Sequence, residues 1–110
     1  MKAANETGLV KACLQYLAAR GAYAFRVNSG AMTGEYKGKR RFLRFTSAKG
    51  CSDILGVYRG RFIAVEAKIP GNKPTPDQRD FLDQVAKKGG LALVIRDVAD
   101  LAAAIEKEIG

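Results

Sequence analysis

Hydrophobic and polar positions in the first half of the chain switch between a helical and an extended pattern. Residues 5–20 are amphipathic at helical spacing, so we expect a helix there that Gly21 ends. Its apolar stripe consists of Val10, Cys13, Leu14 and Leu17. Residues 22–28 and 41–46 predict two short strands, and residues 29–38 between them predict a glycine-containing loop.

The middle of the chain is strongly apolar and rich in β-branched residues. Residues 53–58 and 61–68 predict two strands, because Arg59 and Gly60 between them suit a two-residue hairpin turn. Pairing outward from this turn places Tyr58 opposite Arg61, Val57 opposite Phe62, Leu55 opposite Ala64 and Asp53 opposite Glu66. The hairpin therefore predicts that two carboxylates meet at the end far from its turn.

The last third of the chain predicts two helices around one strand. Residues 75–88 predict a helix whose start, Thr75 with Gln78 three residues later, has the capping-box pattern. Residues 91–95 are all apolar, which favours a buried and central strand. Residues 97–109 predict the final helix.

The predicted elements follow the order α-β-β-β-β-α-β-α. A meander, in which each strand pairs with the next along the chain, followed by a helical crossover and a buried strand predicts an α/β fold, with a central mixed sheet flanked by helices. A length of 110 residues is typical of a single domain, so we assign residues 1–110 to one domain.

The predicted hairpin concentrates charge where a core is expected. Asp53, Glu66 and Lys68 share one face of the hairpin, because strand side chains alternate between faces. Two carboxylates about 5 Å apart repel by roughly 3 kcal/mol at an effective dielectric near 20. A divalent cation between them would offset this repulsion. The alternative is that Lys68 neutralises one acid in a structural salt bridge.

Composition narrows the chemistry further. The chain has a formal charge of +8 and no histidine. The charge favours a polyanionic partner, and the lack of histidine argues against the usual nucleophilic triads and against zinc. We interpret the two cysteines, Cys13 and Cys51, as small buried hydrophobes. No apolar run reaches membrane-spanning length and no signal-peptide pattern occurs, so we expect a cytoplasmic protein without a membrane partner.

Two further polar residues have both a structural and a functional interpretation. Glu6 falls on the apolar stripe of the first helix, at its N-terminal end. It either complements the helix dipole or adds a ligand near the acid pair. Gln78 either belongs to the capping box or turns toward the site, and the sequence leaves both open.

Together these residues resemble the VRR-NUC (virus-type replication-repair nuclease) domain of the PD-(D/E)XK nuclease superfamily. The resemblance covers nearly the whole chain and is carried by Glu6, "RVNSG" at 26–30, "GCSD" at 50–53, "VEAK" at 65–68 and "TPDQ" at 75–78. The chain departs from the family at Ser52, where many members have proline. The resemblance implies a restriction-endonuclease-like αβββαβ core.

The resemblance also implies a nuclease that depends on Mg²⁺ or Mn²⁺. Asp53, Glu66 and the backbone carbonyl of Ala67 would hold the metal, and Glu6 would contact it directly or through water. Lys68 would orient the attacking water or stabilise the transition state, and Gln78 would orient Lys68 or the phosphate. Stand-alone domains of this kind look like phage-encoded homodimers acting on branched DNA such as four-way (Holliday) junctions, which would place this one in the host cytoplasm.

Basic residues outside the acid pair, together with one asparagine, would contact the DNA backbone. The candidates are Arg26, Asn28, Lys37, Lys39, Arg40, Arg41, Arg44 and Lys49. Taken singly, each lysine or arginine is equally well explained as a solvated surface charge. For the dimer, the last helix at residues 102–105 or the strand at 42–45 could form the interface.

Two other functions stay open on sequence alone. A non-catalytic nucleic-acid-binding module could keep the same fold, although the presence of Asp53, Glu66 and Lys68 disfavours it. A restriction-type enzyme with sequence specificity would need a recognition surface, for which a chain of 110 residues has little room.

Overall fold

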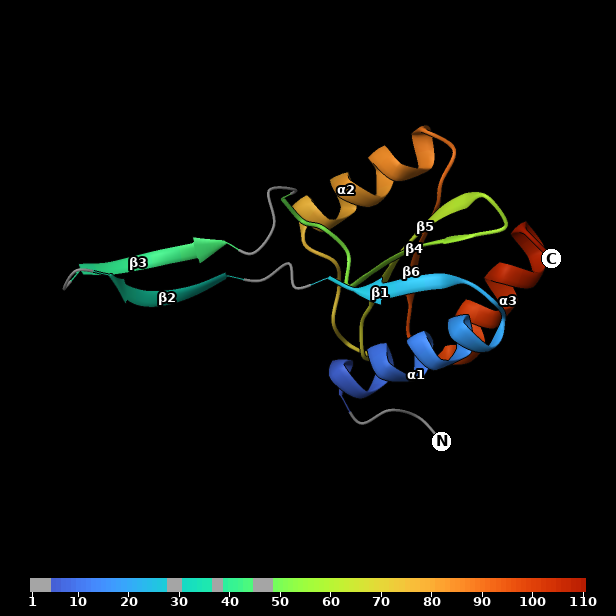
Figure 1. Ribbon diagram of the computed structural model, residues 1–110, viewed down its shortest axis with the longest axis horizontal. Coiled ribbons are helices and arrows are strands. Elements are labelled where there is room, and N and C mark those ends of the chain that lie inside the picture. Colours follow the sequence, from blue (N-terminus) through green and yellow to red (C-terminus); the bar gives the residue numbers. More distant parts are fainter. Residues whose placement is uncertain (1–4, 28–30, 37–38, 45–48) are drawn as a thin grey trace.

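The computed structural model of the chain describes residues 5–27, 31–36, 39–44 and 49–110. Its elements, in chain order, are α1 (Glu6–Ala19), β1 (Tyr23–Arg26), β2 (Ala31–Tyr36), β3 (Lys39–Arg44), β4 (Ile54–Tyr58), β5 (Arg61–Ala67), α2 (Pro76–Lys87), β6 (Leu91–Ile95) and α3 (Val98–Glu108). Figure 1 shows them as a three-layer body from which β2 and β3 project.

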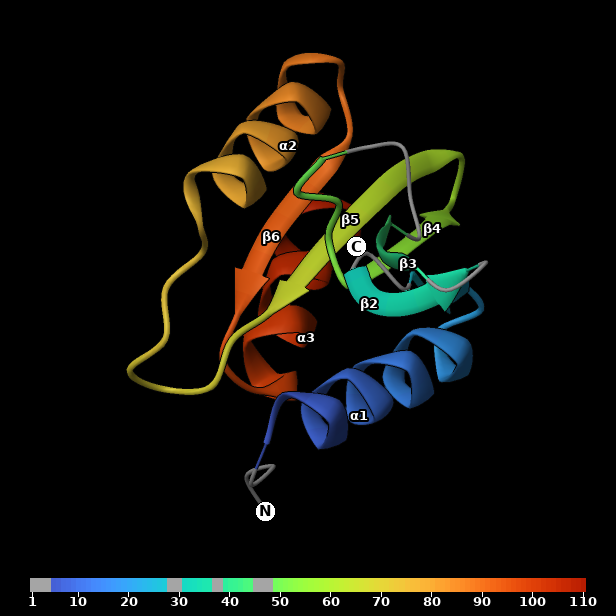
Figure 2. The ribbon, with the colours of Figure 1, turned by 90° about the vertical axis from the view of Figure 1, so that its left-hand side faces the viewer.

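The body is a four-stranded mixed sheet between helices, which confirms the predicted α/β class. The strand order is β1-β4-β5-β6, and only the β5–β6 pair is parallel. Helices α1 and α3 cover one face, and α2 covers part of the other (Figures 1 and 2). The core between the sheet and the α1–α3 pair contains Leu9, Leu17, Ile54, Ile63, Val65, Leu101 and Ile105, among others.

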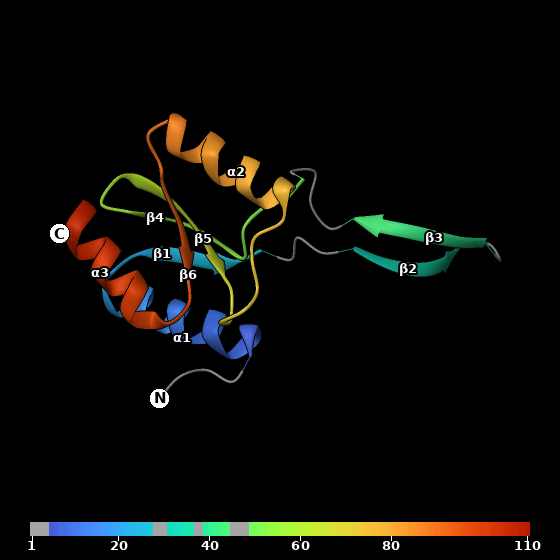
Figure 3. The ribbon, with the colours of Figure 1, turned by 180° about the vertical axis from the view of Figure 1, so that it is seen from behind.

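Strands β2 and β3 form a second, two-stranded sheet. They pair with each other in antiparallel register from Ala31↔Arg44 to Tyr36↔Lys39, and they extend away from the body in Figures 1 and 3. Two expectations are therefore wrong. Residues 29–38 contain a strand where the sequence predicts a loop, and β1 pairs with β4 rather than with the next strand along the chain.

Without this inserted hairpin, the body has the order α1-β1-β4-β5-α2-β6, which is the predicted αβββαβ core, followed by α3. The insertion explains why sequence reasoning predicted a meander: it counted one strand of the insertion among those of the main sheet.

The β4–β5 turn confirms the predicted hairpin. Arg59 and Gly60 have φ angles of 50° and 77°, and positive values at both turn positions are typical of the type I′ turn that joins two-residue hairpins. The observed pairs include Tyr58↔Arg61, Val57↔Phe62 and Leu55↔Ala64, as predicted.

The expectation of a central position for β6 is wrong. The strand lies at the edge of the sheet and, among the described strands, pairs only with β5. Its uniformly apolar sequence is instead explained by its two faces, since α3 packs on one and α2 on the other. Within the described part of the chain, no helix is both long and apolar enough to cross a membrane.

Candidate active site

The predicted acid pair lies where β4 begins and β5 ends. Ile54 pairs with Val65, so Asp53, one residue before β4, stands opposite Glu66 on β5. The Ala67 backbone N–H donates to Asp53 Oδ2 at 3.0 Å. This hydrogen bond fixes the Asp53 carboxylate against the end of β5, on the same side of the hairpin as predicted.

Glu66 is a carboxyl group inside the protein. Its residue is 1% exposed, and its pKa is raised to about 9. Burial is the largest cause, followed by the hydrogen bond and the charge of Asp53, while the Lys68 ammonium lowers this pKa and Glu6 adds a smaller upward effect. The buried Oε2 atom has no hydrogen-bond partner among the described residues.

This arrangement fits a hard cation. A buried acceptor without a donor is costly, and an ion between Asp53 and Glu66 would satisfy it and remove the repulsion. The Ala67 carbonyl suits the same ion, because the N–H and C=O of a strand residue leave the backbone on the same side, and the Ala67 N–H faces Asp53. Among the described residues, no third His, Cys, Asp or Glu joins the pair closely enough to form a three-residue metal group.

Lys68 directly follows β5. Its backbone N–H donates to the Ile95 carbonyl at 3.0 Å, which extends the β5–β6 ladder by one residue. The salt-bridge alternative is not observed: ion pairs in the described parts of the chain join Arg20 to Glu106 and Lys49 to Asp77. The Lys68 ammonium is therefore close enough to act on Glu66 electrostatically without being paired to it.

Glu6 begins α1 and is held by a loop. Its Oε2 accepts a hydrogen bond from Asn72 Nδ2 at 3.0 Å. Arg96 fixes this loop by donating from Nη1 to the carbonyls of Ile69, at 3.0 Å, and Asn72. The segment that follows Lys68 thus connects the start of α1 to the end of β6. The Asn72 hydrogen bond uses only one of the two carboxylate oxygens of Glu6.

Gln78 forms the capping box that the sequence allowed. Its Oε1 accepts from the Thr75 N–H at 2.8 Å, while Thr75 Oγ1 accepts from the Gln78 N–H at 3.2 Å. Because the Oε1 atom is used by the cap, any contact with Lys68 or a phosphate would have to come from the side-chain NH₂ group. The catalytic role of Gln78 stays a prediction.

The segment preceding Asp53 is packed tightly against α2. Gly50 has φ of 74°, and a Cβ atom there would lie 2.2 Å from the Asp77 carbonyl oxygen. Ser52 is fully buried, and its Oγ donates to the Ile54 carbonyl at 3.0 Å. Ser52 therefore makes a hydrogen bond that a proline at this position could not make. Cys51 is buried, as expected, and its thiol pKa is raised by burial and by Glu66 and Asp53.

The predicted DNA contacts have different surroundings. Arg26 is exposed at the end of β1. Lys49 Nζ lies 3.6 Å from Asp77 Oδ2, at the start of α2. Lys39, Arg40, Arg41 and Arg44 belong to β3, whereas Asn28 and Lys37 lie outside the described residues.

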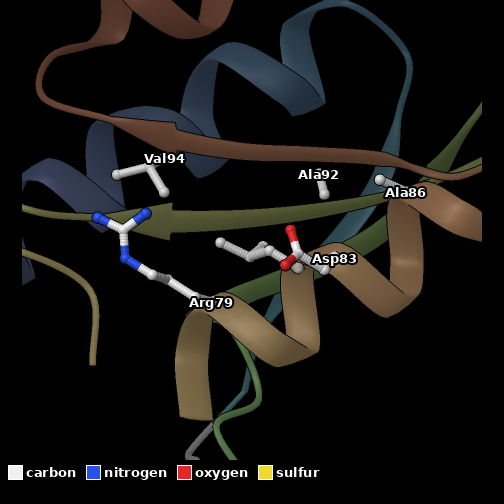
Figure 4. A pocket seen from close by; sticks show the side chains of 6 residues that line it. Arg79, Asp83, Ala86, Ala92 and Val94 are labelled. Carbon is white, nitrogen blue, oxygen red and sulfur yellow. The ribbon is translucent and has the colours of Figure 1, made fainter. Parts of the chain in front are cut away.

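A pocket of about 250 Å³ lies between α2 and β6 (Figure 4). Its lining consists of Arg79, Leu82, Asp83, Ala86, Ala92 and Val94. Val94 pairs with Glu66 in the β5–β6 register, so the pocket lies on the same sheet face as the acid pair, although none of the predicted site residues lines it.

Sequence reasoning missed three residues that shape this site: Gly50, Asn72 and Arg96. Gly50 stands in the quoted "GCSD" motif, so a glycine three residues before the acid was the available signal. Asn72 and Arg96 act through contacts spanning 66 and 24–27 residues, and no local pattern announces such contacts.

Comparison with known proteins supports the fold. No family model matches the sequence, and no curated protein matches it. A solved structure described as "VRR_NUC domain protein" superimposes with a TM-score of 0.61, covering 99% of this chain and 91% of that chain, at 17% sequence identity. The chain therefore has the same fold as the protein described as a VRR_NUC domain protein.

Proposed function

We propose that this protein is a nuclease that hydrolyses DNA phosphodiester bonds with the help of Mg²⁺ or Mn²⁺. The observation that carries the proposal is the buried Glu66 carboxyl, whose Oε2 has no partner in the described structure, facing Asp53 at one end of the hairpin. A carboxylate pair that is this costly to fold is typical of functional sites. The VRR-NUC fold supports a nuclease in particular.

Each site residue has a role that follows from its position. Asp53, Glu66 and the Ala67 carbonyl would hold the ion, which when bound supplies charge for the phosphate and makes a water molecule more acidic. Lys68, unpaired within the described structure, presents its ammonium to the developing charge on the phosphate. Glu6 would contact the ion through water, because Asn72 already occupies one of its oxygens.

Cleavage of labelled four-way-junction, flap and linear DNA tests the proposal. The assay compares wild type with Glu66→Gln, in Mg²⁺, in Mn²⁺ and in EDTA. Glu108→Gln is a matched control, since Glu108 is an exposed carboxylate in the last turn of α3. We expect metal-dependent cleavage that Glu66→Gln reduces at least 100-fold and that Glu108→Gln leaves unchanged.

Branched DNA is the substrate we propose, and the same assay ranks it against the flap and the linear duplex. Equal cleavage of all three would contradict structure selectivity. Salt-sensitive DNA binding without cleavage in either metal would contradict the nuclease function and favour a non-catalytic nucleic-acid-binding module.

We also propose that two copies pair through the open part of the sheet. The predicted helix interface is not available in full, because Ile105 is fully buried in the core, and the side chains of the other candidate, residues 42–45, lie outside the description. Among the residues whose side chains the structure describes, the large exposed apolar ones are instead Tyr23 (76%), Phe25 (48%), Val57 (46%) and Phe62 (42%) on β1, β4 and β5, with Val94 on β6.

The register joins these side chains into one strip. Tyr23 pairs with Val57 and Val57 with Phe62, so the three form a row across the sheet beside Phe25. The four expose on the order of 400 Å² of side chain, about half of what each partner of a stable dimer buries. Sedimentation should show a dimer at micromolar concentration that Val57→Asp dissociates, and a wild-type monomer would overturn the pairing.

A further inference from the structure

The β2–β3 hairpin has features that neither the core nor the metal site explains. It is a separate two-stranded sheet in which six residue pairs run from Ala31↔Arg44 to Tyr36↔Lys39. A two-stranded hairpin without a covering layer is only marginally stable in water. Such an element gains stability from a partner, so its composition and position should reveal what that partner is.

The hairpin is rooted at the candidate active site. Val27, which follows β1, donates its N–H to the Asp53 carbonyl at 2.7 Å. The returning chain passes Gly50, packed on the start of α2, and reaches Asp53 three residues later. Both roots therefore flank the same acid, and Figures 1 and 3 show the hairpin extending from this end of the body.

Charge is concentrated on the hairpin. Residues 31–44 hold five basic residues and one acid, a net +4 that is half of the chain's +8 in 14 of its 110 residues. Four of these basic residues, Lys39, Arg40, Arg41 and Arg44, belong to β3. A ribbon with this much positive charge suits a polyanionic partner.

We propose that the β2–β3 hairpin is a duplex-reading ribbon that lies in the DNA major groove beside the cut site. The major groove is wide enough for a two-stranded β-ribbon, and phosphates line both of its walls. Six strand residues span about 20 Å, which corresponds to roughly six base pairs at 3.4 Å each. This inference rests on the proposed nuclease function and names how its DNA would be held.

Chemical protection of the DNA bases tests the groove directly. Dimethyl sulfate methylates guanine N7 in the major groove and adenine N3 in the minor groove, so one experiment on wild-type protein bound to duplex-armed junction DNA in EDTA separates the two. We expect guanine N7 protection over about six consecutive base pairs of one arm. Adenine N3 protection in its place, or no protection beyond the cut site, would overturn the inference.

A charge-neutral ribbon supplies the second measurement. The variant carries Lys39→Gln, Arg40→Gln, Arg41→Gln and Arg44→Gln, and the matched control carries Lys11→Gln, Lys87→Gln, Lys88→Gln and Lys107→Gln, four exposed lysines on or beside the helices. Plotted as log affinity against log salt, the slope of the ribbon variant should fall by about 3.6, at about 0.9 per phosphate contact. The control variant should change this slope by less than about one.

A shortened ribbon guards against a folding defect. Replacing residues 35–40 by Asn-Gly removes two of the six residue pairs and leaves the body of the fold, which should keep its far-UV circular dichroism. The guanine N7 footprint should shrink from about six to about four base pairs. An unchanged footprint would overturn the ribbon's groove contact.

Failure of this inference is distinguishable from failure of the proposed function. If cleavage depends on the metal but the footprint and the salt slope are the same in the ribbon variants as in wild type, the proposed nuclease function stands and the proposed groove contact fails. If the footprint depends on the ribbon but no metal supports cleavage, the groove contact stands and the nuclease function fails.

Discussion

The two faces of the main sheet differ in how completely helices cover them. On the α1–α3 face, Ile54, Ile63 and Val65 are completely buried. On the other face, α2 covers only part of the sheet, so Val57 and Phe62 are each more than two-fifths exposed. The acid pair lies on this second, half-open face.

The difference teaches how one hairpin can serve stability and chemistry together. Because strand side chains alternate, each residue of β5 contributes to one face only. Ile63, Val65 and Ala67 pack in the core. The residues that alternate with them, including Glu66, face the other side of the sheet. The fold can therefore keep an unfavourable carboxyl pair on one face while the opposite face stabilises the same strand.

The largest expected effect follows from truncating the covered face. Ile63→Ala should lower the free energy of unfolding by about 2–5 kcal/mol, because the side chain is fully buried and its removal leaves a cavity. Val57→Ala, six residues away and half exposed, should cost about 1 kcal/mol or less. Urea unfolding of the two variants measures the comparison, and equal losses would mean that the two faces do not differ as described.

The next effect concerns Gly50, where the site segment meets α2. Gly50→Ala should destabilise by about 2–4 kcal/mol, because the new methyl group would overlap the Asp77 carbonyl and because alanine disfavours φ of 74°. Gly60→Ala is the control, since its φ of 77° is similar but no atom lies within 4 Å of the new Cβ. It should cost about 1 kcal/mol.

The difference between these two glycine variants isolates the packing of α2 from the backbone strain. Thermal unfolding gives both values, and only Gly50→Ala should also reduce metal-dependent cleavage. A Gly60→Ala loss as large as that of Gly50→Ala would show that strain alone is responsible.

Sequence reasoning succeeded where the determining contacts are short in range. The Asp53–Glu66 pairing follows from a two-residue turn and the alternation of two adjacent strands, and the Thr75–Gln78 cap spans three residues. It failed for β2, because "AMTGEY" contains Gly34 and Glu35, which are poor strand residues, and forms a strand only with a partner in β3. It misplaced β6 because an apolar strand between two helices resembles a central strand.

A third test acts on the half-open face. Glu66→Gln should stabilise the protein in EDTA by about 1–3 kcal/mol at pH 8, because glutamine is neutral, whereas Glu66 must take up a proton to be buried beside Asp53. A carboxyl whose folded pKa is about 9, above its ordinary value of 4.5, folds best when protonated. Wild type should therefore lose stability relative to Glu66→Gln as the pH rises from about 5 to 9.

Mg²⁺ should reverse the order of these two proteins, because an ion between the carboxylates stabilises wild type alone. Thermal unfolding across this pH range, with EDTA or Mg²⁺, gives both results. A pH-independent difference between wild type and Glu66→Gln would contradict the explanation that Glu66 takes up a proton on folding.

The smallest effect belongs to Asn72, which links the open face to the start of α1. Asn72→Ala removes the hydrogen bond to Glu6 Oε2 and should cost only about 0.5–1 kcal/mol of stability, because this contact is exposed. The Mg²⁺ concentration for half-maximal cleavage should nevertheless rise a few-fold, since Glu6 is no longer held beside the acid pair. Arg96→Ala, which removes both Arg96 hydrogen bonds to this loop, should raise this Mg²⁺ concentration further. A loss of maximal rate at an unchanged Mg²⁺ requirement would place Asn72 outside the proposed metal site.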